Sequence, residues 1–291
     1  MVSRNTVAAL SSAAVLLAAL AGCAPADEAS PSAGASASAS GPACAPGTLG
    51  TRTAGKLTIG TDNPAYEPWF SDNKPANGKG FESAVAYQVA ERLGYKAPDV
   101  VWTNVTFNNA IAPGPKTFDF DVNQFSITPE RRKAVDFSSP YYLVRQTVIT
   151  TKGSKIAGVK TIAELKGAKL GAQVGTTSYQ AINELIKPTA KAQVYNNNDD
   201  AKAALENGQV DGIVVDLPTA FYMTAAELDN GVIVGQLPQV GVPEQFGLVL
   251  DLGSPLTTCV SQAVDQLRQD GTLAVLEKQW LASTGGAPEL S

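Results

Sequence analysis

Residues 121–142 read DVNQFSITPERRKAVDFSSPYY. The stretch begins as the end of a predicted strand that carries the hydroxyl of Ser126, and it continues into a cluster of three cations at 131–133. It ends in a segment rich in Ser, Pro and Tyr, a composition that favours turns and extended chain over helix. The extended character continues to residue 147. We therefore interpret residues 138–147 as a crossing, that is, a segment in which the chain passes from one folded unit to another.

Strand and helix signals alternate on both sides of this stretch. Strands are predicted at 56–60, 169–174 and 210–216, and helices at 81–93 and 255–268. The run VDGIVVD at 210–216 is almost continuously apolar, as a strand buried on both faces requires. Repeated alternation of this kind is typical of an α/β protein with mainly parallel sheets.

A second extended segment, at 242–247, resembles a return crossing. Two crossings make the first unit discontinuous, because it is then built from both ends of the chain, and they predict a ligand cleft between two lobes. The chain beyond position 43 holds about 240 residues, which is enough for two domains. The predicted parts are lobe 1 at 44–142 with 246–284, lobe 2 at 146–242, and a tail at 285–291.

The N-terminal end has the pattern of an export signal. Arg4 gives a positive start, residues 7–20 are apolar but too short to span a membrane, and the letters LAGC end at Cys23. This resembles the lipobox of bacterial lipoproteins, which implies a signal peptide at 1–22 and acylation of Cys23. The alternative is a plain secretory signal. Residues 23–43 are rich in Ala, Ser and Pro, and we expect a tether to the outer face of the cytoplasmic membrane.

Composition excludes several classes of function. The net charge of −5 argues against nucleic acid or an anionic lipid surface as a partner. The chain has no His, which excludes His-dependent triads and removes the commonest zinc ligand, so we expect no metal and no cofactor. With Cys23 assigned to lipid, an oxidising compartment favours a disulfide between Cys44 and Cys259, with two free thiols as the alternative.

The stretch at 121–142 resembles the signature of the bacterial extracellular solute-binding proteins of family 3, the polar-amino-acid receptors of ABC importers. The resemblance runs from about residue 56 to residue 281 and implies a two-lobed periplasmic-binding-protein-like α/β fold (type II) with a hinge and a ligand cleft. It also implies a monomer that docks to ABC permease subunits. Six further segments match in family order: GTDNPAYEPWF, GFESAVAYQVAERLG, LKGAKLGAQVGTTS, VDGIVVD, EQFGLVL and LRQDGTLAVLEKQWL.

The resemblance assigns the charged ends of the ligand to particular residues. Arg131 stands at the family's carboxylate-binding position, and its planar guanidinium fits a carboxylate bidentately. Ser126 is the matching hydroxyl, and Thr177 offers its backbone amide from the other lobe. Asp216 ends an apolar strand, where an open α/β sheet binds ligands, and is the expected partner of the ammonium. Structural roles are the alternatives: an ion pair for Arg131, and helix N-caps for Thr177 and Asp216.

Aromatic side chains are expected to wall the pocket. Tyr66 and Phe107 match the family's wall positions, and Trp69 could extend that wall, since flat rings exclude water and strengthen ion pairs. Core packing is the alternative for each of the three.

Three polar side chains are candidates for contact with the rest of the ligand. Gln173 matches a position that often touches the ligand's side chain in relatives, and Asp62 one that often touches the ligand's polar side chain or its amine. Gln124 departs from the pattern, since relatives often have a small residue there, and we expect it to reach the ligand or to narrow the pocket. Together they favour a polar or cationic ligand side chain.

The leading interpretation is a membrane-tethered, extracytoplasmic binding protein that is not an enzyme. It would bind a polar amino acid or a similar small zwitterion between two closing lobes and deliver it to an ABC importer. The alternative is a catalytic relative on the same scaffold, similar to a dehydratase. Because the chain has no His, its acid–base candidates would be Glu82, Asp62 and Asp216.

Overall fold

The computed structural model describes residues 44, 47–281 and 286–291. The predicted signal peptide at 1–22, the lipidated Cys23 and the tether at 23–43 lie outside these residues. Within the described part of the chain, no helix is long and apolar enough to cross a membrane.

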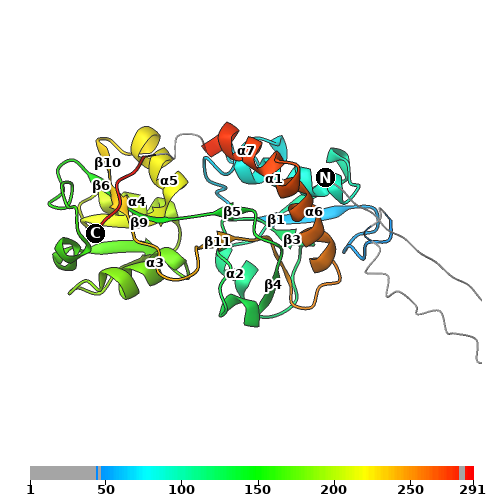
Figure 1. Cartoon of the computed structure of the whole chain (residues 1–291), viewed down its shortest axis with the longest axis horizontal. Helices are drawn as coiled ribbons and strands as arrows, with labels where there is room; N and C mark the ends of the chain where they lie inside the picture. Colours follow the sequence, from blue (N-terminus) through cyan, green and yellow to red (C-terminus); the bar gives the residue numbers. More distant parts are fainter. Residues whose placement is uncertain (1–43, 45–46, 282–285) are drawn as a thin grey trace, which may run out of the picture. The chain divides into compact units, whose positions relative to one another are not determined.

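Five strands form the first sheet, in the order β2-β1-β3-β12-β4 (Figure 1). Strands β2, β1 and β3 are parallel, and β12 runs antiparallel to both β3 and β4. Helices α1, α6 and α7 pack against one another beside this sheet, and we call the assembly lobe 1. Its elements are β1 (Leu57–Thr61), α1 (Phe81–Arg92), β2 (Val100–Asn104), α2 (Phe107–Ile111), β3 (Phe120–Asp121), β4 (Val135–Phe137), β12 (Val249–Asp251), α6 (Thr257–Gln269) and α7 (Thr272–Leu281).

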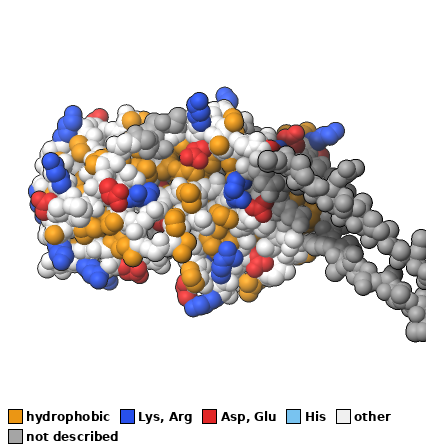
Figure 2. Space-filling view, in the orientation of Figure 1, with side chains coloured by type: hydrophobic (Ala, Val, Ile, Leu, Met, Phe, Trp, Pro, Cys, Tyr) orange, Lys and Arg blue, Asp and Glu red, His pale blue; other side chains and the backbone are white. Residues whose placement is uncertain are grey.

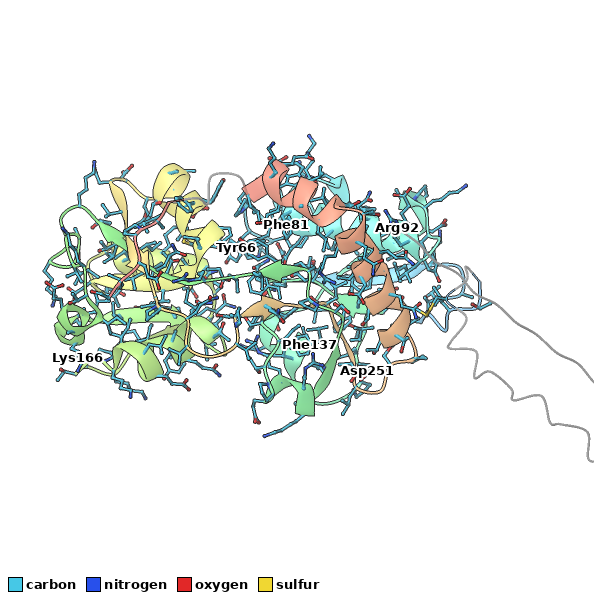
Figure 3. The ribbon with its side chains drawn as sticks, viewed as in Figure 1. Tyr66, Phe81, Arg92, Phe137, Lys166 and Asp251 are labelled. Atoms are coloured by element: carbon cyan, nitrogen blue, oxygen red, sulfur yellow. A yellow bond between two sulfur atoms is a disulfide. The ribbon has the colours of Figure 1, made fainter. Side chains whose placement is uncertain are left out.

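Helix α1 shows why these residues fold as predicted. Phe81, Val85 and Val89 recur one turn apart, and each is fully buried against the core of lobe 1 (Figure 3 labels Phe81). The helix ends where Gly94 takes a φ of 85°, a left-handed conformation that glycine adopts at little cost.

The second sheet also has five strands, in the order β10-β6-β9-β7-β8, and we call it lobe 2 with its helices. Strands β9, β7 and β8 are parallel, whereas β6 runs antiparallel to its neighbours β9 and β10. Its elements are β6 (Gln146–Thr151), β7 (Leu170–Gln173), α3 (Thr177–Ala181), β8 (Gln193–Tyr195), α4 (Asn198–Glu206), β9 (Gly212–Asp216), α5 (Leu217–Tyr222) and β10 (Gly231–Gln236).

Short helical turns complete both lobes. The π-helical turns η5 and η6 continue α3 and α5, so each predicted helix there is regular only over its first part. The turns are η1 (Pro75–Asn77), η2 (Ala97–Asp99), η3 (Arg131–Lys133), η4 (Ile162–Gly167), η5 (Ile182–Ile186) and η6 (Met223–Glu227).

Two short strands lie between the sheets. β5 (Tyr142–Leu143) and β11 (Gln245–Phe246) pair antiparallel, with Leu143 opposite Gln245. They fall inside the two segments that we interpreted as crossings, so both connections run side by side. In each sheet the strand that follows a connection, β6 or β12, is the antiparallel one, which explains why the sheets are mainly but not wholly parallel.

The predicted disulfide is confirmed. Cys44 and Cys259 are bonded, with their Cα atoms 5.4 Å apart, and the bond ties the start of the described chain to α6 (Figure 3). The closed loop spans 215 residues, so the bond removes much freedom from the unfolded chain.

We therefore expect the double variant Cys44→Ser/Cys259→Ser to lose about 2–4 kcal/mol of unfolding free energy. Guanidinium denaturation measures this loss, and reduced wild-type protein should show the same midpoint as the double variant. An unchanged midpoint in both would contradict a stabilising role for the bond.

The C-terminal residues 286–291 are docked on lobe 2. Leu290 is buried, its N–H donates to the carbonyl of Gln236 at 2.9 Å, and the Gln236 N–H donates to the carbonyl of Pro288 at 2.7 Å. Glu289 pairs with Arg145 at 3.0 Å. One buried leucine and a few main-chain bonds thus attach a segment that we had expected only as a tail.

Charged side chains of both signs are interspersed over the face that Figure 2 shows. Exposed ion pairs such as Lys133–Glu130 contribute little to stability, because water screens them. Charged groups that are buried between the two lobes have larger effects on the free energy, because water does not screen them.

Candidate ligand site

A small cavity lies between the two lobes. Its volume is about 30 Å³. Lobe 1 contributes Asp62, Tyr66, Phe107, Asn123, Gln124 and Arg131, and lobe 2 contributes Gln173, Thr176, Thr177, Ser178, Asn198, Val215 and Asp216. In Figure 3 the label of Tyr66 lies between the two lobes.

Arg131 is a mostly buried cation whose guanidinium donates to main-chain carbonyl oxygens. It begins the short turn η3, and its Nη1 donates to the carbonyl of Ser126 at 2.7 Å while Nη2 donates to the carbonyl of Gly175, in lobe 2, at 3.0 Å. Its guanidinium also lies 5.2 Å from the centre of the Phe107 ring. Burial lowers the pKa of Arg131 to about 10, so the group remains charged at neutral pH.

Among the described residues, no carboxylate forms an ion pair with Arg131. A guanidinium that is largely removed from water costs several kcal/mol unless an anion compensates it. The structural ion pair that was the alternative for Arg131 is therefore not present in the described part of the chain, and its guanidinium is available to an anionic group of a ligand.

Asp216 lies at the end of β9 and faces the same cavity. It occupies the N-cap position of α5 without making a side-chain capping bond, and one carboxylate oxygen instead accepts from Gln146 Nε2 at 2.8 Å. Burial, and next the neighbouring Glu244 carboxylate, raise the pKa of Asp216 well above its usual value. A carboxylate destabilised in this way gains most when a cation pairs with it.

Ser126 and Thr177 meet across the lobes. Their hydroxyl oxygens are 3.2 Å apart, and Ser126 donates to Glu244 at 2.6 Å. Thr176, rather than Thr177, is the N-cap of α3, since its hydroxyl accepts from the N–H of Tyr179. The capping alternative that we considered for Thr177 thus belongs to its neighbour.

The aromatic candidates divide between the cavity and the core. Tyr66 and Phe107 line the cavity, and Phe107 stacks on Phe125 with ring centres 4.9 Å apart. Trp69 does not line it. Trp69 is fully buried among core aromatics such as Phe246, and its indole N–H donates to Thr219 of lobe 2 at 2.9 Å. Its ring packs edge-on against three aromatic rings of the core.

Asp62 and Gln173 both line the cavity. The two oxygens of Asp62 already accept from main-chain N–H groups, those of Asn63 at 2.7 Å and Phe107 at 2.9 Å. These bonds fix the Asp62 carboxylate in place and anchor the start of α2 beside it. Gln173 ends β7 and is 8% exposed, so only the end of its side chain reaches the open space.

Gln124 lines the cavity but donates away from it. Its backbone has a φ of 49°, which explains why a small residue suits this position, and its N–H donates to Glu82 Oε1 at 2.7 Å. Its side-chain nitrogen donates to the other oxygen of Glu82. Glu82 is fully buried in α1 and also accepts from the Tyr141 hydroxyl, and burial raises its pKa to about 7.

Sequence reasoning missed several residues around the cavity. Glu244 accepts from Ser126 and from Gln146, and Gln146 accepts from Ser178 at 2.6 Å, so these side chains connect the two lobes behind Asp216. Glu244 falls within the segment predicted as a crossing, where nothing in a Pro-Glu-Gln run marks a buried contact. The other missed lining residues are Asn123, Thr176, Asn198 and Val215.

A larger, more open hollow of about 830 Å³ borders Thr177 and Glu244. Its lining includes the exposed Val240 and Val242. The arginines that line this hollow differ from Arg131 in their surroundings, because Arg132 is exposed and Arg145 already forms an ion pair with Glu289. We therefore place the candidate site in the small cavity. No cluster of three or more His, Cys, Asp or Glu side chains within the described ranges could hold a metal ion.

Comparisons with known proteins identify similar sequences over most of the chain. Residues 57–283 match the family model described as bacterial extracellular solute-binding proteins, family 3. The ABC transporter glutamine-binding protein GlnH of Bacillus subtilis (strain 168) is 30% identical over 217 residues, covering 73% of this chain and 77% of that protein.

Solved structures of similar proteins share the fold. An ancestral arginine-binding protein bound to arginine superposes with a TM-score of 0.65 at 31% identity, covering 78% of this chain and 98% of that one. The ancestral amino acid-binding protein AncCDT-1, a precursor of cyclohexadienyl dehydratase, gives a TM-score of 0.64 at 33% identity, covering 78% and 95%. Both the α/β class and the two-lobed architecture expected from the sequence are confirmed by these matches.

Proposed function

Because the chain belongs to the bacterial extracellular solute-binding proteins of family 3, we propose that it is the substrate-binding component of an amino acid ABC importer. It captures a free amino acid between its lobes and releases it unchanged to permease subunits. The observation that carries this proposal is the guanidinium of Arg131, which has no carboxylate partner among the described residues and lines the same cavity as Asp216.

The two charges suit the two ends of an amino acid zwitterion. Arg131 would bind the carboxylate through its planar fork, and Asp216 would bind the ammonium. Burying a charged end of the ligand without a partner costs several kcal/mol. When each end pairs with an opposite charge of the protein, the ion pairs offset the desolvation of both the ligand and the protein groups. Because Arg131 belongs to lobe 1 and Asp216 to lobe 2, a ligand that pairs with both stabilises the closed arrangement of the lobes.

The N-terminal signals extend the proposal to location. The family is extracellular by description, and we propose that Cys23 is acylated and that residues 23–43 tether the lobes to the outer face of the cytoplasmic membrane. A flexible tether of about 20 residues has a mean reach on the order of 25 Å, which keeps a monomeric binding protein close to its permease.

Catalysis on this scaffold has weaker support. The similarity to AncCDT-1 links the fold to the ancestry of an enzyme. However, both oxygens of Asp62 accept main-chain hydrogen bonds, and Glu82 is fully buried and is not among the residues that line the cavity. Of the three acids considered from the sequence, Asp62 and Asp216 line the cavity, and we assign Asp216 to the ammonium.

A screen of the common amino acids by thermal shift tests the proposal. A true ligand at about 100 times its dissociation constant adds about 2.7 kcal/mol to the unfolding free energy, which raises the Tm by roughly 5–10 °C for a protein of this size. Isothermal titration should then give one site per chain. If no amino acid raises the Tm or releases heat on binding, the proposed function is wrong.

A further inference from the structure

Glu82 adjoins the candidate site through Gln124, from which it accepts two hydrogen bonds. One Glu82 oxygen accepts from the Gln124 N–H at 2.7 Å and from the Tyr141 hydroxyl, and the other accepts from the Gln124 side-chain nitrogen. Glu82 is fully buried in the first turn of α1 and does not line the cavity, whereas Gln124 does. Glu82 therefore affects the cavity through Gln124.

The chemistry of Glu82 decides which way the carboxamide of Gln124 faces. An ionised carboxylate accepts hydrogen bonds and donates none, so the amide must turn its NH₂ group toward Glu82. Among the hydrogen bonds of the described residues, none engages the other end of that amide, its oxygen Oε1. We propose that Glu82 is a positioning residue that fixes the Gln124 carboxamide with its oxygen toward the ligand, so that the site selects amino acids whose side chains carry cationic N–H donors.

The other charges of the cavity point to the same class of ligand. Its lining holds two carboxylates, Asp62 and Asp216, and one guanidinium, Arg131, so with Asp216 ionised the formal charges of the lining sum to −1. An amino acid with a neutral side chain leaves that charge in place, because its own two ends cancel. A guanidinium or ammonium on the side chain neutralises it and donates to the Gln124 oxygen, whereas a side-chain carboxylate is repelled by both.

This inference rests on the proposed function, and its test compares two ligands of nearly equal shape. Citrulline has the shape of arginine but replaces one donor nitrogen of the guanidinium by a carbonyl oxygen and is neutral. We expect the wild-type protein at pH 8.5, where Glu82 is ionised, to bind arginine more tightly than citrulline in isothermal titration. The quantity of interest is the ratio of the two dissociation constants.

The variant Glu82→Gln should lower that ratio about tenfold. Its amide oxygen must still accept from the Gln124 N–H and Tyr141, so its new NH₂ group meets the Gln124 side-chain nitrogen, and two donors cannot bond. The Gln124 amide then rotates and presents its own NH₂ to the ligand, which costs arginine one charge-assisted hydrogen bond and favours the carbonyl of citrulline.

Matched variants separate positioning from folding. Tyr141→Phe removes the third donor to Glu82 but keeps both bonds to Gln124, and its ratio should stay within twofold of the wild type. Gln124→Met removes the amide at nearly constant size and should lower the ratio even if Glu82→Gln folds poorly. In the double variant Glu82→Gln/Gln124→Met the ratio should match that of Gln124→Met, because Glu82 acts through that amide.

The outcomes distinguish a failure of this inference from a failure of the proposed function. If Glu82→Gln changes both dissociation constants by the same factor, Glu82 is only structural and the inference is wrong while amino acid binding stands. The same holds if the wild type prefers citrulline or glutamate to arginine. If the wild type binds no amino acid at all, the proposed function fails, and the inference fails with it.

Discussion

Replacing Arg131 by alanine is expected to weaken amino acid binding by roughly 10²- to 10⁴-fold, because removing one partner of a buried ion pair costs about 3–5 kcal/mol. The ligand carboxylate would enter a cavity whose other charges, Asp62 and Asp216, are negative. Arg131→Lys should lose less, since it keeps the charge but not the bidentate fork. Isothermal titration with the ligand found in the thermal screen measures both variants.

Arg132 provides the control for this prediction. It belongs to the same short turn as Arg131 and carries the same charge, but it is exposed, with its guanidinium 5.6 Å from the centre of the Phe137 ring. Arg132→Ala should bind the ligand within about twofold of the wild type, since exposed charges contribute little. If Arg131→Ala binds as well as Arg132→Ala, the carboxylate is held elsewhere.

Replacing Asp216 by asparagine should separate binding from stability. Binding should weaken by roughly 10²-fold or more, because the ligand ammonium loses its buried counter-charge. The ligand-free variant should nevertheless be more stable than the wild type at pH 8. Burial raises the pKa of Asp216 in the folded protein. At pH values above its pKa in the unfolded chain, ionisation of Asp216 therefore lowers the free energy of unfolding. This destabilisation becomes smaller as the pH falls through the raised pKa of the folded protein.

The same raised pKa predicts how binding by the wild type depends on pH. A ligand ammonium favours the ionised carboxylate, so the complex binds fewer protons than the free protein and affinity falls as the pH is lowered through the raised pKa of Asp216. Asp229→Asn, which removes an equal charge from an exposed position, should change neither the affinity nor this pH dependence. Equal Tm values and equal affinities for Asp216→Asn and wild type would refute the assignment.

The fold was predictable because its signals are local. The periodic apolar stripe of α1 and the apolar run that became β9 each determine their own element. The two crossings were visible as extended segments, although their pairing as β5 and β11 joins residues about a hundred positions apart and could not be read from either segment alone. Leu290 docks the C-terminal residues on lobe 2 through contacts with Gln236 that no local pattern marks.

The candidate site was predictable only where a motif carried the chemistry. Arg131 and Asp216 follow from the family's pattern, and the structure brings both to one cavity. The role of Gln124 depends on Glu82, 42 positions away, so its sequence neighbours could not indicate which way its amide turns. Trp69 shows the same limit, because the sequence around an aromatic residue does not indicate whether its ring faces a ligand or, as here, the core.

The most direct measurement is a crystal structure of the protein with the amino acid that gives the largest thermal shift. We expect the ligand's carboxylate within hydrogen-bonding distance of the Arg131 guanidinium and its ammonium in contact with the Asp216 carboxylate, with both lobes closed around the ligand. A ligand bound outside this cavity, or one whose carboxylate and ammonium contact neither residue, would contradict this expectation.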